Sequence, residues 1–104
     1  VDIIIDPGYG FAKTVEQNYA LLEALPQFKA MGFPVLVGIS RKTMIWKPLG
    51  ITPDEALNGT TVLNTVSLLL GADILRVHDV KEAVQVRRIL SLFPNLNNQY
   101  PQPC

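Results

Sequence analysis

Cysteine, histidine and excess charge are scarce in this chain of 104 residues, and each shortage excludes a class of protein. The single cysteine is the last residue, Cys104, so the sequence encodes neither a disulfide framework nor a zinc site built from paired cysteines. Nine basic and nine acidic side chains give a formal net charge of zero, which argues against broad electrostatic attraction to nucleic acid or to an acidic membrane. Any anion site must therefore be local.

Long apolar runs, clustered aromatic residues and common catalytic motifs are also missing. No apolar run reaches the ~18 residues needed to cross a bilayer, and no secretory signal pattern appears. Aromatic residues make up 8% of the chain and are too scattered to form a stacking platform for nucleic-acid bases. The sequence has no P-loop, dinucleotide-binding glycine motif or nucleophile elbow. The cysteine usage fits a reducing compartment, and we expect a cytoplasmic location.

The sequence does contain a repeated pattern in which an apolar segment ends in polar residues. The segments 2–5, 34–38 and 73–77 are predicted to be strands. The first lacks polar alternation and is expected to be buried on both faces, and the second is also apolar throughout. Each is followed by a polar loop and a helix start with capping-type spacing, at Thr14–Gln17, Thr52–Glu55 and Asp79–Glu82. The alternation of strand and helix predicts right-handed crossovers and a parallel sheet.

Helical spacing predicts four segments. The first begins after Thr14 and is kinked or split at Pro26 before it ends near Gly32. A short turn is expected over 41–49, a helix from 52 to about 70, and a last helix from 79 to about 93. Gly59 costs its helix about 1 kcal/mol relative to alanine, which indicates close packing there. The predicted inward residues are Val15, Tyr19, Leu22 and Leu25; Ala56, Leu63, Val66 and Leu70; and Ala83, Val86, Leu90 and Phe93.

Three parallel strands with their helices do not form a complete fold, because the backbone hydrogen-bonding groups at both edges of such a sheet have no neighbouring strand. The chain is 48% hydrophobic and starts at Val1 without methionine, so we expect it to be part of a longer protein. The predicted fold class is α/β, formed by the last three βα units of an eightfold β/α (TIM) barrel. Residues 1–93 are expected to form this part, and the polar, proline-rich residues 94–104 a poorly ordered tail.

The loops after parallel strands lie at one end of a sheet, so the polar residues that follow each strand should converge. Asp6 ends the first strand and could accept two adjacent N–H donors of a planar ligand, such as a guanidine or an aminopyrimidinone. Alternatively, Asp6 accepts backbone amides of its own loop. Lys42 could donate to ring heteroatoms or balance an anion, or simply be solvated. Ser40 is a ligand donor or a helix cap, and Arg41 could pair with a neighbouring loop.

Arg76 and His78 lie two residues apart at the end of the third strand, so they project to the same side. Together they form a compact cationic pair suited to phosphate or pyrophosphate. Asp79 is assigned mainly to the N-cap of the following helix, with a secondary role in orienting His78. Asp6 has no second carboxylate or histidine nearby in its loop, so this chain is not expected to bind a metal by itself.

Three motifs together resemble the dihydropteroate synthases of folate synthesis: DPGYGFAK at 6–13, GISRKT at 38–43 and GADILRVHDV at 71–80. Gly59-Thr60 also fits that family pattern, and the match extends from Val1 to about Phe93. Tyr9 stands where an aliphatic residue is common in the family, and Ala12 where glycine is common. The resemblance implies a β/α barrel of which this chain is similar to the sixth, seventh and eighth units.

The resemblance also implies a reaction. The family joins 4-aminobenzoate to 6-hydroxymethyl-7,8-dihydropterin pyrophosphate and releases pyrophosphate. By the family pattern, Asp6 binds the aminopyrimidinone edge of the pterin, and Lys42 contacts the pterin ring near the aminobenzoate. Thr43 would reach the aminobenzoate or its sulfonamide mimics, and Phe11 would help to wall that pocket. The pyrophosphate would be bound by Arg76 and His78.

The resemblance further implies Mg²⁺, bound mainly by parts of the barrel outside this chain, and a homodimer for the whole protein. The expected partners are the pterin pyrophosphate, 4-aminobenzoate and the remainder of the barrel, without nucleic acid or membrane. The chain alone should be inactive. One alternative is a pterin-binding domain for methyl transfer, which the Arg76 and His78 pair argues against because that reaction has no pyrophosphate. The other alternative is a barrel fragment without catalytic function.

Overall fold

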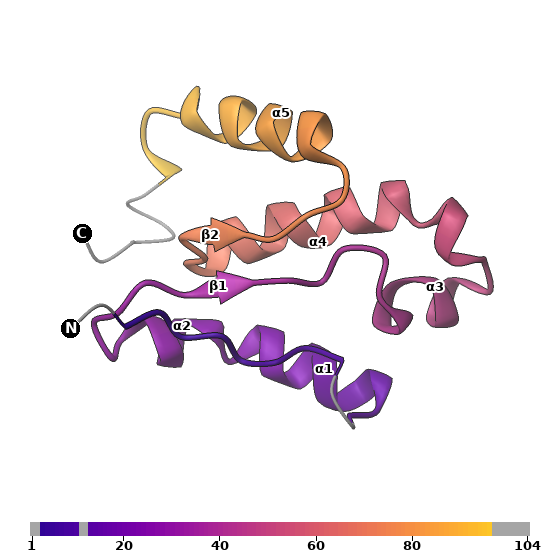
Figure 1. Cartoon of the computed structure of the whole chain (residues 1–104). Helices are drawn as coiled ribbons and strands as arrows, with labels where there is room; N and C mark the ends of the chain where they lie inside the picture. The colour runs from indigo at the N-terminus through magenta and orange to yellow at the C-terminus, as the bar shows by residue number, and fades with distance from the viewer. Residues whose placement is uncertain (1–2, 11–12, 97–104) are drawn as a thin grey trace.

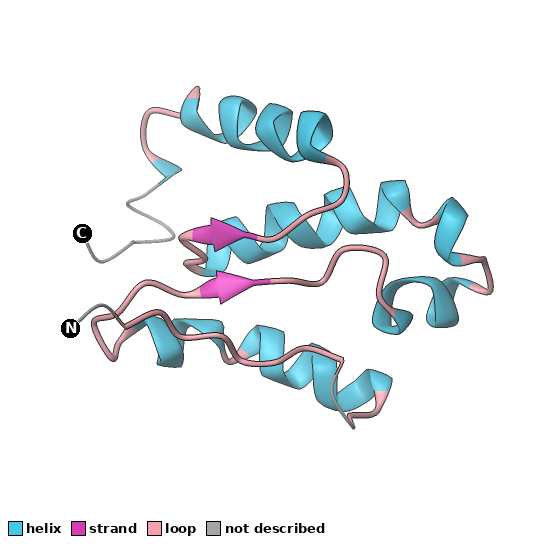
Figure 2. Cartoon of the chain, viewed as in Figure 1, coloured by secondary structure: helices cyan, strands magenta, loops and turns pink. Residues whose placement is uncertain are grey.

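The computed structural model describes residues 3–10 and 13–96. Two short strands lie side by side, and helices precede, connect and follow them (Figures 1 and 2). In order, the elements are α1 (Val15–Glu23), α2 (Leu25–Lys29), β1 (Leu36–Val37), α3 (Thr43–Leu49), the 3₁₀ helix η1 (Pro53–Glu55), α4 (Leu57–Leu70), β2 (Ile74–Leu75) and α5 (Val80–Ser91). None of the helices in the described ranges has the length and apolarity to cross a membrane.

The three predicted strand segments are neighbours and run parallel, as expected. β1 pairs with β2 in the register Leu36 to Ile74, and an isolated parallel bridge joins Ile5 to Val35. Regular pairing is much shorter than predicted. The first segment is joined to the second by that single bridge, and only the second and third segments form a continuous ladder.

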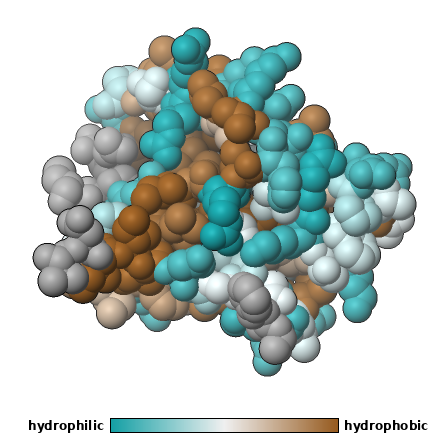
Figure 3. Space-filling view, in the orientation of Figure 1, coloured by the Kyte–Doolittle hydropathy of each residue, from teal (hydrophilic) through white to brown (hydrophobic). Residues whose placement is uncertain are grey.

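The prediction that the first segment is buried on both faces is wrong. Ile3 and Ile4 are 45% and 53% exposed, and Ile74 of β2 at the opposite edge is 37% exposed. In the view of Figure 1, α1, α2 and α4 lie behind the strand segments, and no helix covers the near side. The space-filling view of this side shows apolar residues in continuous patches (Figure 3). The apolar character of these segments therefore exceeds what the described chain buries.

The capping box at Thr14 forms as predicted and starts α1. The Gln17 amide donates to Thr14 Oγ1 at 3.1 Å, and the Thr14 amide donates to Gln17 Oε1 at 2.8 Å. Pro26 stands in the first turn of α2, so the predicted split into two segments is confirmed. Gly32 has φ of 87° in the turn that follows α2, a conformation that favours glycine.

The helix predicted from 52 to 70 is interrupted. The capping box of Thr52 and Glu55 is present, but it starts only the 3₁₀ turn η1, and α4 begins at Leu57. At this interruption Arg41 donates through Nη1 to the carbonyls of Pro53 and Asp54, at 2.9 and 3.2 Å, and the Pro53 carbonyl also accepts the Ala56 amide of the 3₁₀ turn.

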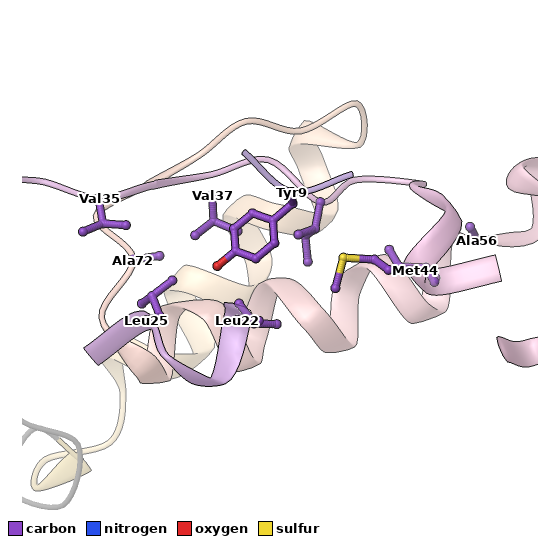
Figure 4. Close-up of a cluster of buried hydrophobic side chains, with 10 residues drawn as sticks. Tyr9, Leu22, Leu25, Val35, Val37, Met44, Ala56 and Ala72 are labelled. Carbon is purple, nitrogen blue, oxygen red and sulfur yellow. The ribbon is translucent and has the colours of Figure 1, made fainter. Parts of the chain in front are cut away.

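The core lies between the strand segments and helices α1 to α4. Its buried members come from loops, strands and helices: Tyr9, Leu22, Leu25, Val35, Val37, Ile39, Met44, Ile45, Ala56 and Ala72 (Figure 4). Close packing at Gly59 is confirmed, because a Cβ added there would lie 2.5 Å from Ile45 Cγ2. This contact sets how closely α3 and α4 approach.

The predicted inward residues of α4 do face the core: Ala56 is buried, and Leu63, Val66 and Leu70 are partly buried and pack against it. The most buried residues of α4 itself were not predicted and are Thr60, Asn64 and Ser67. Their short polar side chains permit close approach, and Ser67 Oγ donates to its own helix at the Leu63 carbonyl, 2.6 Å away. On α5, Val86 is buried as predicted, but Phe93 is 55% exposed, so the predicted stripe is shorter than expected.

An ion pair fixes the amino ends of the strands. Lys29 at the end of α2 pairs with Asp73 just before β2, and the Asp73 carboxylate also accepts the Val35 amide at 2.8 Å. This pair ties together α2 and the starts of β1 and β2.

Most of the predicted tail 94–104 lies outside the described residues.

Candidate functional site at the carboxyl ends of the strands

The polar residues that follow the strand segments gather at one end of the sheet, as the sequence predicts. Asp6 follows the segment at Ile5, Ser40 to Lys42 follow β1, and Arg76 to His78 follow β2. The Arg76 amide still belongs to the strand pairing, since it donates to the Val37 carbonyl at 3.0 Å. Parallel pairing therefore delivers charged groups from all three segments to one place.

Asp6 and Arg76 approach each other loosely. Arg76 Nη1 lies 3.7 Å from Asp6 Oδ2, and the two side chains are 59% and 42% exposed. The other Asp6 oxygen, Oδ1, accepts the Gly8 amide at 3.0 Å. Both interpretations of Asp6 thus have a counterpart: one oxygen fixes the loop, and the other faces a cation. A carboxylate accepts several hydrogen bonds, so Asp6 keeps capacity for a ligand.

Gly38 makes room for the Arg76 guanidinium. A Cβ added at Gly38 would lie 2.7 Å from Arg76 Nη2 and 3.0 Å from Cζ. The guanidinium therefore lies across the backbone at the end of β1. The glycine that opens the segment GISRKT has a steric role that the sequence analysis did not assign.

Lys42 belongs to the same cluster. Its Nζ donates to the Tyr9 carbonyl at 2.7 Å, and its Cδ lies 3.3 Å from where a Cβ of Gly10 would be. Burial lowers the pKa of Lys42, the nearby Arg76 lowers it further, and Asp6 opposes both effects. The opposing influence of Asp6 and Arg76 on this ammonium shows that the three charged groups share one electrostatic environment.

The loop 7–10 is held by residues that the sequence analysis did not single out. Asn18 is buried; its Oδ1 accepts the Gly10 amide at 2.8 Å, and its Nδ2 donates to the Thr14 carbonyl. Lys13 Nζ donates to the Gly8 carbonyl at 2.9 Å. Side chains in a helix lean toward its N-terminus, so an asparagine in the first turn after a cap was the available signal.

Tyr9 is the buried anchor of this loop. Its ring is 1% exposed and packs in the core against helix α1, and its hydroxyl has no hydrogen-bond partner among the described residues. Burial raises the pKa of Tyr9 well above its usual value, and the nearby Asp6 raises it further. The phenol therefore stays neutral, and its ring packs in the core beneath the loop that carries Asp6.

His78 joins the site through Ser40. The Ser40 hydroxyl accepts the His78 amide at 3.2 Å and lies 2.9 Å from His78 Nδ1. Ser40 does not cap α3, because the N-cap position is Lys42. The capping interpretation of Ser40 is therefore wrong, and its contact is with the neighbouring strand end.

Arg41 and Asp79 tie the same two strand ends together. Arg41 Nε and Nη2 each lie 3.0 Å from one Asp79 oxygen, a bidentate pair, and the Arg41 amide donates to Thr60 Oγ1. The bond from Arg41 lowers the pKa of Asp79. The predicted ion pair of Arg41 with a neighbouring loop is confirmed. Asp79 does stand at the N-cap of α5, but the predicted cap bond from its side chain is absent because Arg41 binds both oxygens.

The remaining predicted site residues are less closely joined. Thr43 is exposed at the first position of α3 and lines a surface pocket of about 430 Å³ with Lys13 and Lys47. Phe11 lies outside the described residues. In the described ranges, no three histidine, cysteine, aspartate or glutamate side chains gather as a metal site would require.

Comparisons with known proteins agree with this geometry. A family model described as pterin binding enzyme matches residues 1–78. The dihydropteroate synthase of Escherichia coli is 43% identical over 100 residues, which is 94% of this chain and 36% of that protein.

Solved structures give the same picture. The dihydropteroate synthase of Coxiella burnetii, in complex with pteroic acid, superposes with a TM-score of 0.82 at 43% identity, over 86% of this chain and 34% of that one. The enzyme of Thermus thermophilus, in complex with 4-aminobenzoate, superposes with a TM-score of 0.82 at 36% identity. The match covers 88% of this chain and 37% of that one. The chain therefore spans about a third of the length of the relatives it matches.

Proposed function

This chain belongs to the family of pterin-binding enzymes, and we propose that it forms the C-terminal part of a dihydropteroate synthase. In this proposal its strand segments are the sixth, seventh and eighth of a TIM barrel. Three features support that place: the segments run parallel, the helices α1, α2 and α4 cover one side only, and the outermost apolar residues are exposed at both edges. A closed barrel would bury those edges and fill the uncovered side with side chains.

The observation that carries the proposal is the cluster of Asp6, Lys42 and Arg76. A pterin presents two adjacent N–H donors on one edge, and a carboxylate with a free oxygen matches them. In our proposal Asp6 takes that edge, and Lys42 donates to the heteroatoms of the ring. Thr43 would reach the aminobenzoate, a role that the proposal shares with Phe11 outside the described residues.

The proposed chemistry follows from charge. Loss of pyrophosphate from the pterin leaves a cation delocalised over the ring, and an ionised Asp6 stabilises that cation. Arg76 and His78 stabilise the negative charge that develops on the leaving group. The aromatic amine of 4-aminobenzoate is a weak nucleophile, so we propose that departure of pyrophosphate runs ahead of attack. No residue of this chain is required as a covalent nucleophile.

The remainder of the barrel is the proposed partner of both edges. A groove of about 460 Å³ between β2 and α5 is lined by Leu75, Val77, Val80 and Val84 together with Arg87, and at the other edge Ile3 and Ile4 are exposed. Such apolar surface suits neighbouring strands and helices. We also propose a homodimer for the whole protein and a cytoplasmic location.

Magnesium does not fit the described residues by themselves. Asp6 is the one carboxylate in the cluster with Lys42 and Arg76, and two cations beside it disfavour a metal ion there. If magnesium takes part, ligands from elsewhere in the barrel would hold it. A methyl-transfer function has no use for the cationic pair at Arg76 and His78. A fragment without catalysis would be favoured if the completed barrel proved inactive.

The test is to complete the barrel. The chain replaces the matching C-terminal part of the E. coli enzyme, and dihydropteroate formation is measured. We expect activity in the hybrid and none in the isolated chain, which lacks most of the barrel. Asp6→Asn and Arg76→Met should each lower kcat/KM by about a hundredfold, as loss of one charge-stabilising group does.

The matched control is Lys81→Met, which removes an exposed cation on α5. It should leave kcat/KM unchanged. Full activity of the Asp6→Asn hybrid, or turnover by the isolated chain, would contradict the proposal.

A further inference from the structure

The Ser40 hydroxyl is buried against one residue of the neighbouring strand end. Ser40 is 5% exposed, its Oγ accepts the His78 amide at 3.2 Å, and the same oxygen lies 2.9 Å from His78 Nδ1. A serine hydroxyl has one hydrogen to donate and two lone pairs to accept. Over residues 3–10 and 13–96, both hydrogen bonds of this hydroxyl go to His78.

These two contacts decide which nitrogen of the imidazole carries the hydrogen. The backbone amide can only donate, so it occupies a lone pair of Ser40 Oγ. The hydroxyl hydrogen then has one acceptor within reach, the Nδ1 nitrogen. A neutral imidazole that accepts at Nδ1 carries its hydrogen at Nε2. The opposite tautomer would leave a buried hydroxyl hydrogen without an acceptor, which folded proteins rarely tolerate.

We infer that Ser40 is a positioning residue that holds His78 in the Nε2–H tautomer, with that N–H directed away from the core as a donor for an anion. This inference rests on the proposed function only for the identity of the anion, the pyrophosphate group. An anionic oxygen accepts hydrogen bonds, so it binds an Nε2–H and is repelled by an unprotonated Nε2. Arg76, two residues earlier and 59% exposed in its side chain, supplies the adjacent positive charge.

The ion pair of Arg41 and Asp79 lets the effect of Ser40 on His78 be distinguished from a general effect on how the two loops are held together. That pair already ties the end of β1 to the end of β2 through two bonds of 3.0 Å. Loss of the Ser40 hydroxyl therefore leaves the two loops connected. The specific consequence of that loss is freedom of the imidazole ring to rotate and to change tautomer.

The test uses the full 104-residue chain and its single histidine. With ¹⁵N-labelled histidine, a long-range proton–nitrogen correlation spectrum reports Nδ1 and Nε2 separately, under conditions where the ring is neutral. In the native chain, Nδ1 should resonate as an unprotonated nitrogen and Nε2 as a protonated one. In Ser40→Ala the two shifts should move toward each other as the tautomers exchange, and Ser40→Thr, which keeps a hydroxyl, should restore the separation.

Ser91→Ala removes an exposed hydroxyl on α5 and should leave both shifts unchanged. A native Nδ1 that is protonated, nitrogen shifts of a freely exchanging ring, or a Ser40→Ala spectrum equal to the native one would overturn the inference. Inorganic pyrophosphate is then titrated into the same samples. It should shift Nε2 in the native chain and bind about tenfold more weakly to Ser40→Ala, the effect of one hydrogen bond. A fixed tautomer without any pyrophosphate response would instead count against the proposed function.

Discussion

Two ion pairs at opposite ends of the strand segments contrast in how completely they are satisfied. At the amino ends, Lys29 is 9% exposed in its side chain and pairs with Asp73, whose carboxylate also accepts a backbone amide. At the carboxyl ends, Asp6 and Arg76 stay 3.7 Å apart and are 42% and 59% exposed. The charged groups of the first pair bind each other and the backbone, so their role is structural. The second keeps unused hydrogen-bonding capacity, which is what a ligand site requires.

The largest expected effect on stability is at the amino ends. Lys29→Met should lower the free energy of unfolding by about 3 kcal/mol, because it leaves the Asp73 carboxylate without its cation in a partly buried site. Urea denaturation of the chain measures this loss. The matched variant Lys81→Met removes an exposed lysine and should change the free energy by less than about 0.5 kcal/mol. Equal effects of the two variants would show that the Lys29 pair has no structural role.

Substitutions at two glycines compare a position in the packed core with one beside the candidate site. In Gly59→Ala the new Cβ meets the buried Ile45 side chain at 2.5 Å, so we expect a net loss of about 1–2 kcal/mol after the gain in helix propensity. In Gly38→Ala the new Cβ meets the end of the flexible Arg76 side chain, which can move aside. Unfolding free energy should then change by less than about 0.5 kcal/mol, while pyrophosphate affinity in the hybrid enzyme falls. A larger stability loss in Gly38→Ala than in Gly59→Ala would contradict this.

A smaller effect is expected at the Arg41 and Asp79 pair as pH falls. The bond to Arg41 lowers the pKa of Asp79 in the folded state, so the pair adds stability above the unfolded pKa of about 3.9. That stability is lost as pH falls through the lower folded value. Unfolding curves of the native chain and Asp79→Asn should therefore differ near neutral pH and converge in acid. A difference that is constant with pH would argue against an ionic contribution.

The smallest effect on stability is expected at the loose pair itself. Arg76→Met should change the free energy of unfolding by less than about 0.5 kcal/mol, because its partner is distant and both side chains are exposed. Arg41→Met serves as the comparison, since it removes a bidentate pair and two backbone contacts nearby, and it should destabilise the chain more. The same denaturation series reports both variants.

Local patterns were enough to predict the parallel arrangement and the meeting of polar residues at one end. Each strand segment is largely apolar and is followed by polar residues. This pattern depends only on residues that are adjacent in the sequence, so it can be recognised without the structure. The capping box at Thr14 and the break at Pro26 are local too, and both form as predicted.

The errors came from partners far away in the chain. Arg41 donates to the carbonyls of Pro53 and Asp54 where the predicted helix is interrupted, and it binds both oxygens of Asp79, which were predicted to cap α5. Ser40 bonds to His78, 38 positions later, rather than to its own helix. No spacing rule reports such contacts. The exposure of Ile3 and Ile4 has a related cause, because their apolar character suits neighbours that the described chain does not contain.

The most direct test measures stability and pterin affinity together in the hybrid enzyme for Asp6→Asn and Lys29→Met. Our account predicts that Asp6→Asn lowers pterin affinity by at least about tenfold, the loss of one charge-assisted hydrogen bond, while its unfolding free energy stays within about 0.5 kcal/mol of native. Lys29→Met should show the reverse, with reduced stability and native affinity at temperatures where it is folded. An Asp6→Asn enzyme that binds the pterin as tightly as the native hybrid would contradict the account.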